Sequence, residues 1–296
     1  MEAVVLSGGG NYGALQVGAL EVLLGAGLRP KMIVGTSAGA LNAIRLAADP
    51  TPAGLREMAA LWRRVTDHDV GSVSLLSGLQ RLVLNRPSLF PSHRFARFLL
   101  ANFPQGVRTF GELTGLNGIR AYTTAVSVEA EEVRVFGDND ADLLIDGAMA
   151  STALPPYFAP WPVGGQRYVD GGVRTNLPLR VAAARGARRM VALWIQQRAT
   201  PPIGRPGMIP VVTNAFSMMV RSLTRLELEW AEARQLEVRL IRLVPPAGIA
   251  FWDFSQPDRL FEAGRLAAEA ALAEAPLPPA QGWWERLRFW RQPGAA

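Results

Sequence analysis

Residues 3–48 are AVVLSGGGNYGALQVGALEVLLGAGLRPKMIVGTSAGALNAIRLAA. This stretch contains a short apolar run at 3–6 and a second predicted strand at 31–34, and each is followed by a glycine-rich turn and a segment with helical character. A short apolar run that ends in a tight turn is typical of a buried parallel strand. Two successive strand–turn–helix units predict an α/β fold with an open, mostly parallel sheet flanked by helices in three layers, α/β/α.

The rest of the chain continues this alternation. Further strands are predicted at 119–126, 132–136, 166–169, 190–195 and 239–244. Further helices are predicted at 53–65, 142–151, from Pro178, at 211–234 and at 258–274, with two shorter helical patterns between 67 and 118 and a loop at 200–210. We therefore expect a single domain over residues 1–275, followed at 276–296 by a proline-rich break and an aromatic, basic tail.

The composition excludes several kinds of chemistry. The chain of 296 residues has no cysteine and two histidines, which excludes disulfide scaffolds, thiol nucleophiles and cysteine-ligated metals, so we expect no metal and no cofactor. The net charge is +6, but the sequence has neither zinc-finger spacing nor an RNA-binding signature. No nucleic-acid partner is therefore expected.

Two segments bear on membrane contact. Residues 3–20 carry no charge, but they lack a basic start and include five glycines, which fits neither a signal peptide nor a spanning helix. Near the other end, Trp283, Trp284 and Trp290 alternate with arginines, a composition suited to the membrane interface. The alternative is that these rings pack on the protein's own core or on a second subunit. We expect a cytoplasmic protein with peripheral membrane contact.

The pentapeptide Gly35-Thr36-Ser37-Ala38-Gly39 has the Gly-x-Ser-x-Gly pattern of a nucleophile elbow. In such a turn a strand passes so sharply into a helix that side chains two positions before and after the serine would collide, and Gly35 and Gly39 avoid this. The helix N-terminus also directs partial positive charge at the serine. The alternative is a plain strand-to-helix turn in which Thr36 or Ser37 caps the helix.

The loop Gly8-Gly9-Gly10-Asn11-Tyr12-Gly13 follows the first predicted strand. Consecutive glycines let backbone N–H groups approach an anionic oxygen, either a phosphate or the oxyanion of acyl transfer. The phosphate interpretation fits less well, because the loop lacks the Gly-Lys-Ser/Thr ending of a phosphate-binding loop.

A nucleophilic serine needs a base, and Asp170-Gly171-Gly172 offers one at the end of a predicted strand. A carboxylate removed from water there would have a raised pKa and could accept the serine proton directly. Local pattern alone also permits Asp138 or Asp146. His93 is a weaker candidate, and His68 lies in a polar turn typical of a solvated side chain.

Together, the three motifs resemble the patatin-like phospholipase family, and the resemblance covers about residues 2–195. The stretch 150–160 and the pair Asn176 and Pro178 add to it. The resemblance implies a patatin-type fold and metal-free hydrolysis of lipid acyl esters by a serine–aspartate dyad without histidine. Carried over by position, it makes Ser37 the nucleophile and Asp170 the base, and it makes the N–H groups of Gly8, Gly9 and Gly10 the oxyanion hole.

One position departs from the family pattern, which usually has Arg or Lys where this chain has Tyr12. The substrate could therefore be a phospholipid, a lysophospholipid or a neutral acyl ester, with transfer of the acyl group to another alcohol as a variant. The leucine- and phenylalanine-rich region 75–100 is a candidate cover for an acyl-chain pocket, with ordinary helix packing as the alternative. Two other functions stay open: a phosphate- or nucleotide-binding protein using the first glycine loop, and a catalytically weak lipid-binding member of the family.

Overall fold

A computed structural model of the protein describes residues 2–70, 88–196 and 208–277. The tryptophans of the predicted tail, the first half of the region 75–100 and most of the loop 200–210 lie outside these ranges. None of the helices within them combines the length and apolar character that a membrane crossing requires.

The strands form one mixed sheet in the order β5-β6-β3-β2-β1-β7-β8, with β4 attached to β3. Their bounds are β1 Glu2–Leu6, β2 Met32–Thr36, β3 Arg120–Ser127, β4 Val133–Phe136, β5 Trp161–Val163, β6 Gln166–Asp170, β7 Arg189–Ile195 and β8 Glu237–Leu243. The five strands from β3 to β8 in this order are parallel, whereas β4 and β6 run antiparallel to β3, and β5 antiparallel to β6. The mostly parallel sheet predicted from the sequence is confirmed.

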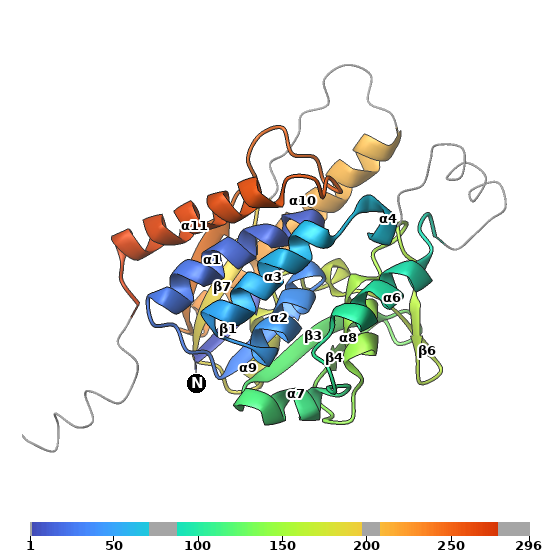
Figure 1. The fold of residues 1–296 in the computed structure, drawn as a ribbon, viewed down its shortest axis with the longest axis horizontal. Helices are drawn as coiled ribbons and strands as arrows, with labels where there is room; N and C mark the ends of the chain where they lie inside the picture. The colour runs from blue at the N-terminus through green and yellow to red at the C-terminus, as the bar shows by residue number, and fades with distance from the viewer. Residues whose placement is uncertain (1, 71–87, 197–207, 278–296) are drawn as a thin grey trace, which may run out of the picture.

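Helices cover both faces of this sheet (Figure 1). Val4 and Leu6 of β1 pack in one apolar cluster with α1 (Ala14–Gly25), α2 (Ala38–Ala48), α3 (Pro52–Arg64) and α11 (Pro257–Glu274). Ala3 and Val5 point the other way, into a cluster with α9 (Leu179–Ala184) and α10 (Met208–Ala233). Because successive side chains of a strand alternate between faces, a strand with apolar residues on both faces, such as β1, needs a layer on each side. This is the predicted three-layer arrangement.

The remaining helices lie around the antiparallel end of the sheet. They are α4 (Asp67–Val70), α6 (Ser92–Asn102), α7 (Phe110–Asn117) and α8 (Leu144–Thr152), with two 3-10 turns, η1 (Gly10–Gly13) and η2 (Gly171–Val173). The predicted boundaries also differ at the second turn. There β2 runs to Thr36 and α2 begins at Ala38, so a single residue, Ser37, joins strand to helix.

The pairing of β3 brings two distant strand ends together. On one edge β3 pairs with β4, which contacts both Ala125 and Val126. The same two residues also pair with β6, so β6 must lie on the opposite edge, the edge that β2 occupies up to Thr124. Since β2 runs parallel to β3 and β6 runs antiparallel to it, the two strands meet with their carboxyl ends facing each other. Thr36 pairs with Thr124, and Asp170 pairs with the next residue, Ala125.

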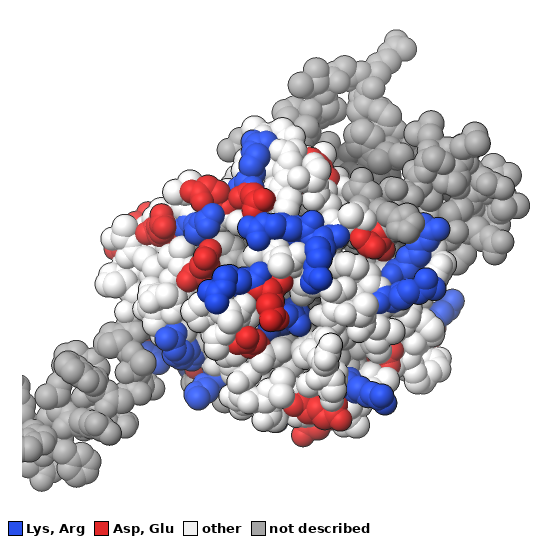
Figure 2. Space-filling model, in the orientation of Figure 1, with Lys and Arg blue, Asp and Glu red and all other residues white. Residues whose placement is uncertain are grey.

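Charged side chains on the face formed by α1, α3 and α11 alternate in sign (Figure 2). Arg63 of α3 pairs with Asp258 of α11 at 2.7 Å, and Arg265 of α11 contacts Glu21 of α1 at 3.4 Å. Such exposed pairs contribute little to stability individually. On this face the positive net charge does not gather into one patch.

Candidate active site

Ser37 occupies a sharp turn between β2 and α2. Its backbone has φ 56° and ψ −126°, a region that non-glycine residues seldom adopt. A Cβ on Gly35 would lie 2.2 Å from the carbonyl oxygen of Gly39, and a Cβ on Gly39 would lie 2.5 Å from that of Leu6. Because backbone atoms cannot move aside as a flexible side chain can, only glycine fits at these two positions. The turn has the geometry that a nucleophile elbow requires.

Asp170 ends β6 and is almost completely buried, with 2% of its surface exposed. Its carboxylate accepts a hydrogen bond from the backbone N–H of Gly172 at 2.7 Å, and the Ser37 side chain lies near enough to lower its pKa as a hydrogen-bonding group. Burial raises the pKa of Asp170 to about 6, and these two groups oppose part of that shift by stabilising the charged form. The structure thus brings Ser37 and Asp170 into direct contact.

The glycine loop lies against this pair. A Cβ on Gly8 would fall 3.0 Å from the Cβ of Ser37, so the backbone here reaches the serine closely. The N–H of Gly8, however, donates to the carbonyl oxygen of Asn176 at 3.1 Å and is committed to the loop's own structure. Those of Gly9 and Gly10 have no acceptor among the described residues. Of the three glycines predicted to form an oxyanion hole, Gly9 and Gly10 thus have N–H groups available to a ligand, and the role itself stays a prediction.

Several polar residues that hold the site were not predicted from the sequence. The Ser151 hydroxyl in α8 accepts the backbone N–H of Ser37 at 2.9 Å. The hydroxyls of Thr36 and Thr124 share a hydrogen bond of 2.6 Å, and Thr36 donates to the carbonyl oxygen of Thr175 at 2.9 Å. These buried bonds join the end of β2 to β3 and to the segment after Asp170. The only sequence signal for Ser151 was its place in the family-like stretch 150–160.

Asn11 and Tyr12 fasten the glycine loop to the segment between β8 and α11. The Asn11 side chain donates to the carbonyl oxygens of Ala250 and Asp253, at 2.9 and 2.8 Å, and accepts the N–H of Trp252 at 3.1 Å. The Tyr12 hydroxyl donates to the carbonyl oxygen of Ile249 at 2.9 Å, and burial raises its pKa. Tyr12 lines neither of the cavities that reach Ser37. It holds a cavity wall in place instead of standing beside the nucleophile.

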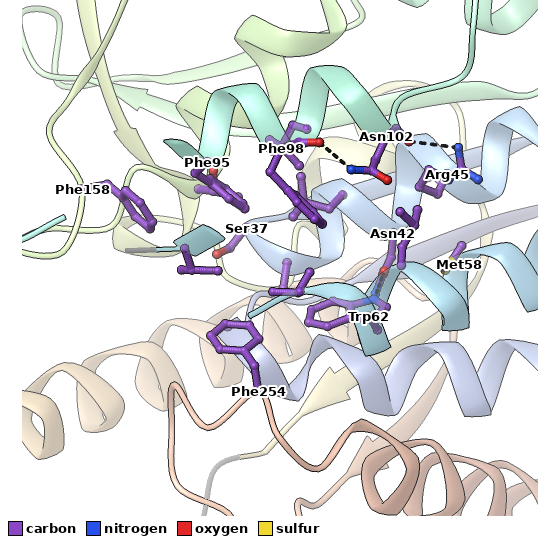
Figure 3. A pocket seen from close by; sticks show the side chains of 18 of the residues that line it. Ser37, Asn42, Arg45, Met58, Trp62, Phe95, Phe98, Asn102, Phe158 and Phe254 are labelled. Atoms are coloured by element: carbon purple, nitrogen blue, oxygen red, sulfur yellow. Dashed lines mark hydrogen bonds between the residues drawn. The ribbon is translucent and has the colours of Figure 1, made fainter. Parts of the chain in front are cut away.

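Two cavities meet at Ser37, which lines both of them together with Gly10 and Leu154. The larger, which we call the helical cavity, comprises about 880 Å³ of space, part of it open to solvent, between α2, α3, α6 and α8. Its walls are largely aromatic: Trp62, Phe95, Phe98, Phe158 and Phe254. Figure 3 shows Ser37 towards one side of this cavity and Arg45 and Asn102 towards the other. The Arg45 guanidinium donates to Glu57 at 3.0 Å and to the Asn102 carbonyl oxygen at 3.3 Å, so its charge is paired.

The smaller cavity, which we call the α10 cavity, encloses about 500 Å³. Asp170, Gly172 and Asn176 line it near Ser37, and Phe216, Val220 and Arg221 line it from α10. Ser37 therefore stands at the junction of an apolar space and a more polar one. An ester bond placed there would have a separate space for each of its two halves.

The other candidate bases lie elsewhere. His93 is exposed on α6 and lines neither cavity. Asp138 is paired with Arg185, and Asp146 accepts the indole N–H of Trp161 at 2.9 Å. The side chain of His68 is outside the described part of the molecule. Of the carboxylates proposed from the sequence, Asp170 is the one that contacts Ser37.

Comparisons with known proteins bear on the family and the fold of this chain. A sequence model described as patatin-like phospholipase matches residues 4–183. An uncharacterized NTE family protein of Mycobacterium tuberculosis is 27% identical over 300 residues, covering 92% of this chain and 46% of that protein. Mouse patatin-like phospholipase domain-containing protein 7 is 28% identical over 198 residues, covering 66% of this chain and 14% of that protein. The chain thus spans less than half the length of the curated relatives it matches.

Among solved structures, VipD from Legionella pneumophila superimposes with a TM-score of 0.51 and 13% sequence identity, covering 92% of this chain and 67% of VipD. At this identity the likeness concerns the fold alone.

Proposed function

The chain belongs to the patatin-like phospholipase family, and from that premise we propose that it is a serine hydrolase that cleaves the carboxylic esters of lipids. One observation carries the proposal: the Ser37 side chain lies beside the buried carboxylate of Asp170, near enough to lower its pKa as a hydrogen-bonding group, where two cavities meet. Acyl transfer needs a nucleophile close to its base and beside an apolar cavity that can hold the acyl chain.

In the first half of the proposed reaction, Oγ of Ser37 forms a bond to the ester carbonyl carbon while its proton passes to Asp170. The carbonyl oxygen becomes an anion, which the free N–H groups of Gly9 and Gly10 stabilise. The intermediate then collapses: the bond from carbon to the alcohol oxygen breaks, and that oxygen takes the proton from Asp170. The products are a free alcohol and an acyl group on Ser37.

In the second half, water attacks the acyl carbon and gives a proton to Asp170. The bond from carbon to Oγ then breaks, Oγ recovers the proton, and a fatty acid leaves. An alcohol that replaced this water would give acyl transfer by the same steps. One carboxylate thus serves as base and acid in turn.

The surroundings of Asp170 suit this double role. With a pKa of about 6, it is a stronger base than an exposed aspartate, yet it is mostly ionised at pH 7. The helical cavity, with its aromatic walls, supplies an apolar space for the acyl chain. Peripheral membrane contact through Trp283, Trp284 and Trp290 stays part of the proposal, and residues 278–296 lie outside the described structure.

The test is hydrolysis of p-nitrophenyl esters of graded chain length by the wild type and three variants. Ser37→Ala and Asp170→Asn are expected to lower kcat/KM by about a thousandfold or more, because the two groups act as one unit. Asp138→Asn, a matched loss of a carboxylate outside the cleft, is expected to leave it unchanged. Mass spectrometry of a slow substrate is expected to locate the acyl group on Ser37. Substantial turnover in Ser37→Ala, or a nucleotide that raises Tm while no ester is cleaved, would contradict the proposal.

A further inference from the structure

Two hydrogen-bond donors in the α10 cavity have no acceptor. Nδ2 of Asn176 and one terminal guanidinium nitrogen (Nη1) of Arg221 are both buried and without a partner in the described parts of the chain. Asn176 itself is 5% exposed. An unpaired buried donor costs free energy, and the cost is larger when the donor is charged. Two such donors in one small cavity indicate a site built for an acceptor that binds there.

The charge of Arg221 is available to a ligand. It is the one cation among the described residues that line the α10 cavity. Of its neighbours there on α10, Phe216 and Val220 are apolar, and Ser217 is a polar residue with an interaction of its own. Asp170 lines the same cavity, but the groups that act on its titration are Ser37 and Gly172, so Arg221 is not its partner. The Arg45 guanidinium of the helical cavity, in contrast, is paired with Glu57.

We propose that the α10 cavity binds a phosphate group on the alcohol half of the substrate ester, with Arg221 and Asn176 as its donors. The inference rests on the proposed function, because it places the ester carbonyl at Ser37. With the acyl chain in the helical cavity, the alcohol half extends into the α10 cavity, since Ser37 lines both. A guanidinium and an amide N–H suit the oxygens of a phosphate, which accept several hydrogen bonds at once. Arg221 would thereby supply the positive charge that Tyr12 does not.

The test compares two lipids that differ only in the phosphate: 1-acylglycerol 3-phosphate and 1-acylglycerol with the same acyl chain, both kept below their aggregation concentrations. The ratio of kcat/KM for the phosphate ester to that for the neutral ester is the readout. Arg221→Gln is expected to lower this ratio about tenfold or more, and Arg221→Lys is expected to restore part of it. Arg225→Gln, an exposed charge one turn further along α10, is the matched control and is expected to leave both values unchanged.

A binding measurement separates this inference from the proposed function. Calorimetry with the Ser37→Ala protein is expected to give a Kd for 1-acylglycerol 3-phosphate that rises about tenfold or more when Arg221→Gln is added. If the wild type cleaves neither lipid, the proposed function fails and this Kd alone decides the inference. If both lipids are cleaved and neither the ratio nor the Kd depends on Arg221, the inference is overturned while the proposed function stands.

Inorganic phosphate distinguishes two sources of the same chemistry. Competitive inhibition of neutral-ester hydrolysis by phosphate in the wild type, weakened in Arg221→Gln, would assign the site to phosphate itself. A change in the lipid ratio without such inhibition would assign it to phosphate carried by a lipid. If Arg221→Gln acts only on substrates presented in anionic vesicles, whatever their headgroup, Arg221 responds to the membrane surface and the inference is wrong.

Discussion

Ser37 is held in a backbone conformation that costs a non-glycine residue about 1–3 kcal/mol. Its surroundings offset part of that cost, because its N–H donates to the Ser151 hydroxyl and its side chain lies beside the Asp170 carboxylate. The strain presents the hydroxyl to both cavities. At the residue scale, the site consists of one strained serine and one carboxylate kept from water.

The first prediction concerns the pH dependence of kcat/KM. Asp170 must be ionised to accept the serine proton, and its pKa is about 6. We expect kcat/KM for a neutral ester to be constant above pH 7 and to fall about tenfold per pH unit below 6. The measurement is a pH profile from 4.5 to 8.5, with His93→Gln as control. A midpoint that moves in His93→Gln would assign the base to histidine instead.

The second prediction concerns stability. Because burial raises the pKa of Asp170, the folded protein binds more protons than the unfolded chain between about pH 4 and 6, and stability from this group is lost as pH rises through that window. Asp170→Asn removes the titration. The variant is expected to gain up to about 3 kcal/mol over the wild type at pH 8, an advantage that is absent at pH 4. Urea denaturation at both pH values measures this, and an equal difference at the two would contradict it.

The sequence indicated Ser37 and Asp170 because each lies in a motif whose glycines are required by close backbone contact. No comparable sequence signal exists for Arg221, which lines the α10 cavity from a helix more than 180 positions after Ser37. A helix pattern states which residues share a face, but not which cavity that face meets. Asn176 was noted only as part of a resemblance, and its unpaired amide emerges from the packing around Gly8 and Gly172.

At the element scale, two helices pack on glycine. A Cβ on Gly264 of α11 would lie 1.9 Å from the carbonyl oxygen of Leu15, and a Cβ on Gly18 of α1 would lie 1.9 Å from that of Phe261. The two backbones therefore touch, and an added methyl group must push the helices apart. Since α11 follows directly on the segment that carries Phe251 and Trp252, this contact also supports the cavity walls.

The third prediction follows from this contact. Gly264→Ala is expected to lower the free energy of unfolding by about 1–3 kcal/mol, the range for overpacked cores. Gly25→Ala, at the end of α1 where nothing lies within 4 Å of the added carbon, is the control and is expected to be neutral or to gain up to about 1 kcal/mol. Urea denaturation of both variants is the measurement. Equal stabilities would show that the helices separate without cost.

Element positions were largely predictable, because buried strands and amphipathic helices differ in their apolar period. The strand β5 was missed, since its three residues Trp161–Val163 include a proline and lie in a proline-rich stretch. An edge strand tolerates such a residue, because it leaves one side of the ladder unpaired. The meeting of β2 and β6 was also beyond local pattern, because it depends on how both strands register against β3.

At the scale of the whole molecule, the question is where the protein could meet a membrane. The match to the mycobacterial relative covers 46% of that protein. The interspersed charges on the face of α1, α3 and α11 give no sign of an electrostatic membrane surface there (Figure 2). The proposal of membrane contact rests instead on the sequence after Pro279, which is rich in aromatic and basic residues.

The fourth prediction tests that contact. Truncation after Pro279 is expected to reduce binding to liposomes of mixed neutral and anionic lipid, while hydrolysis of a water-soluble ester stays unchanged. Co-sedimentation with the liposomes measures the binding, and a full-length protein with Trp283, Trp284 and Trp290 changed to Ala separates the rings from the length of the tail. Equal sedimentation of all three proteins would refute the contact.

The head-on approach of β2 and β6 has a consequence for biosynthesis. Thr36, the residue before Ser37, and Asp170 pair with two successive residues of β3, yet 133 positions separate Ser37 from Asp170 along the polypeptide. A nascent chain that has emerged only as far as β3 carries the serine without its proton acceptor. Under the proposed function, hydrolytic activity would then arise late, when β6 pairs with the end of β3. Incomplete translation products would not hydrolyse the lipids of the cell that makes them.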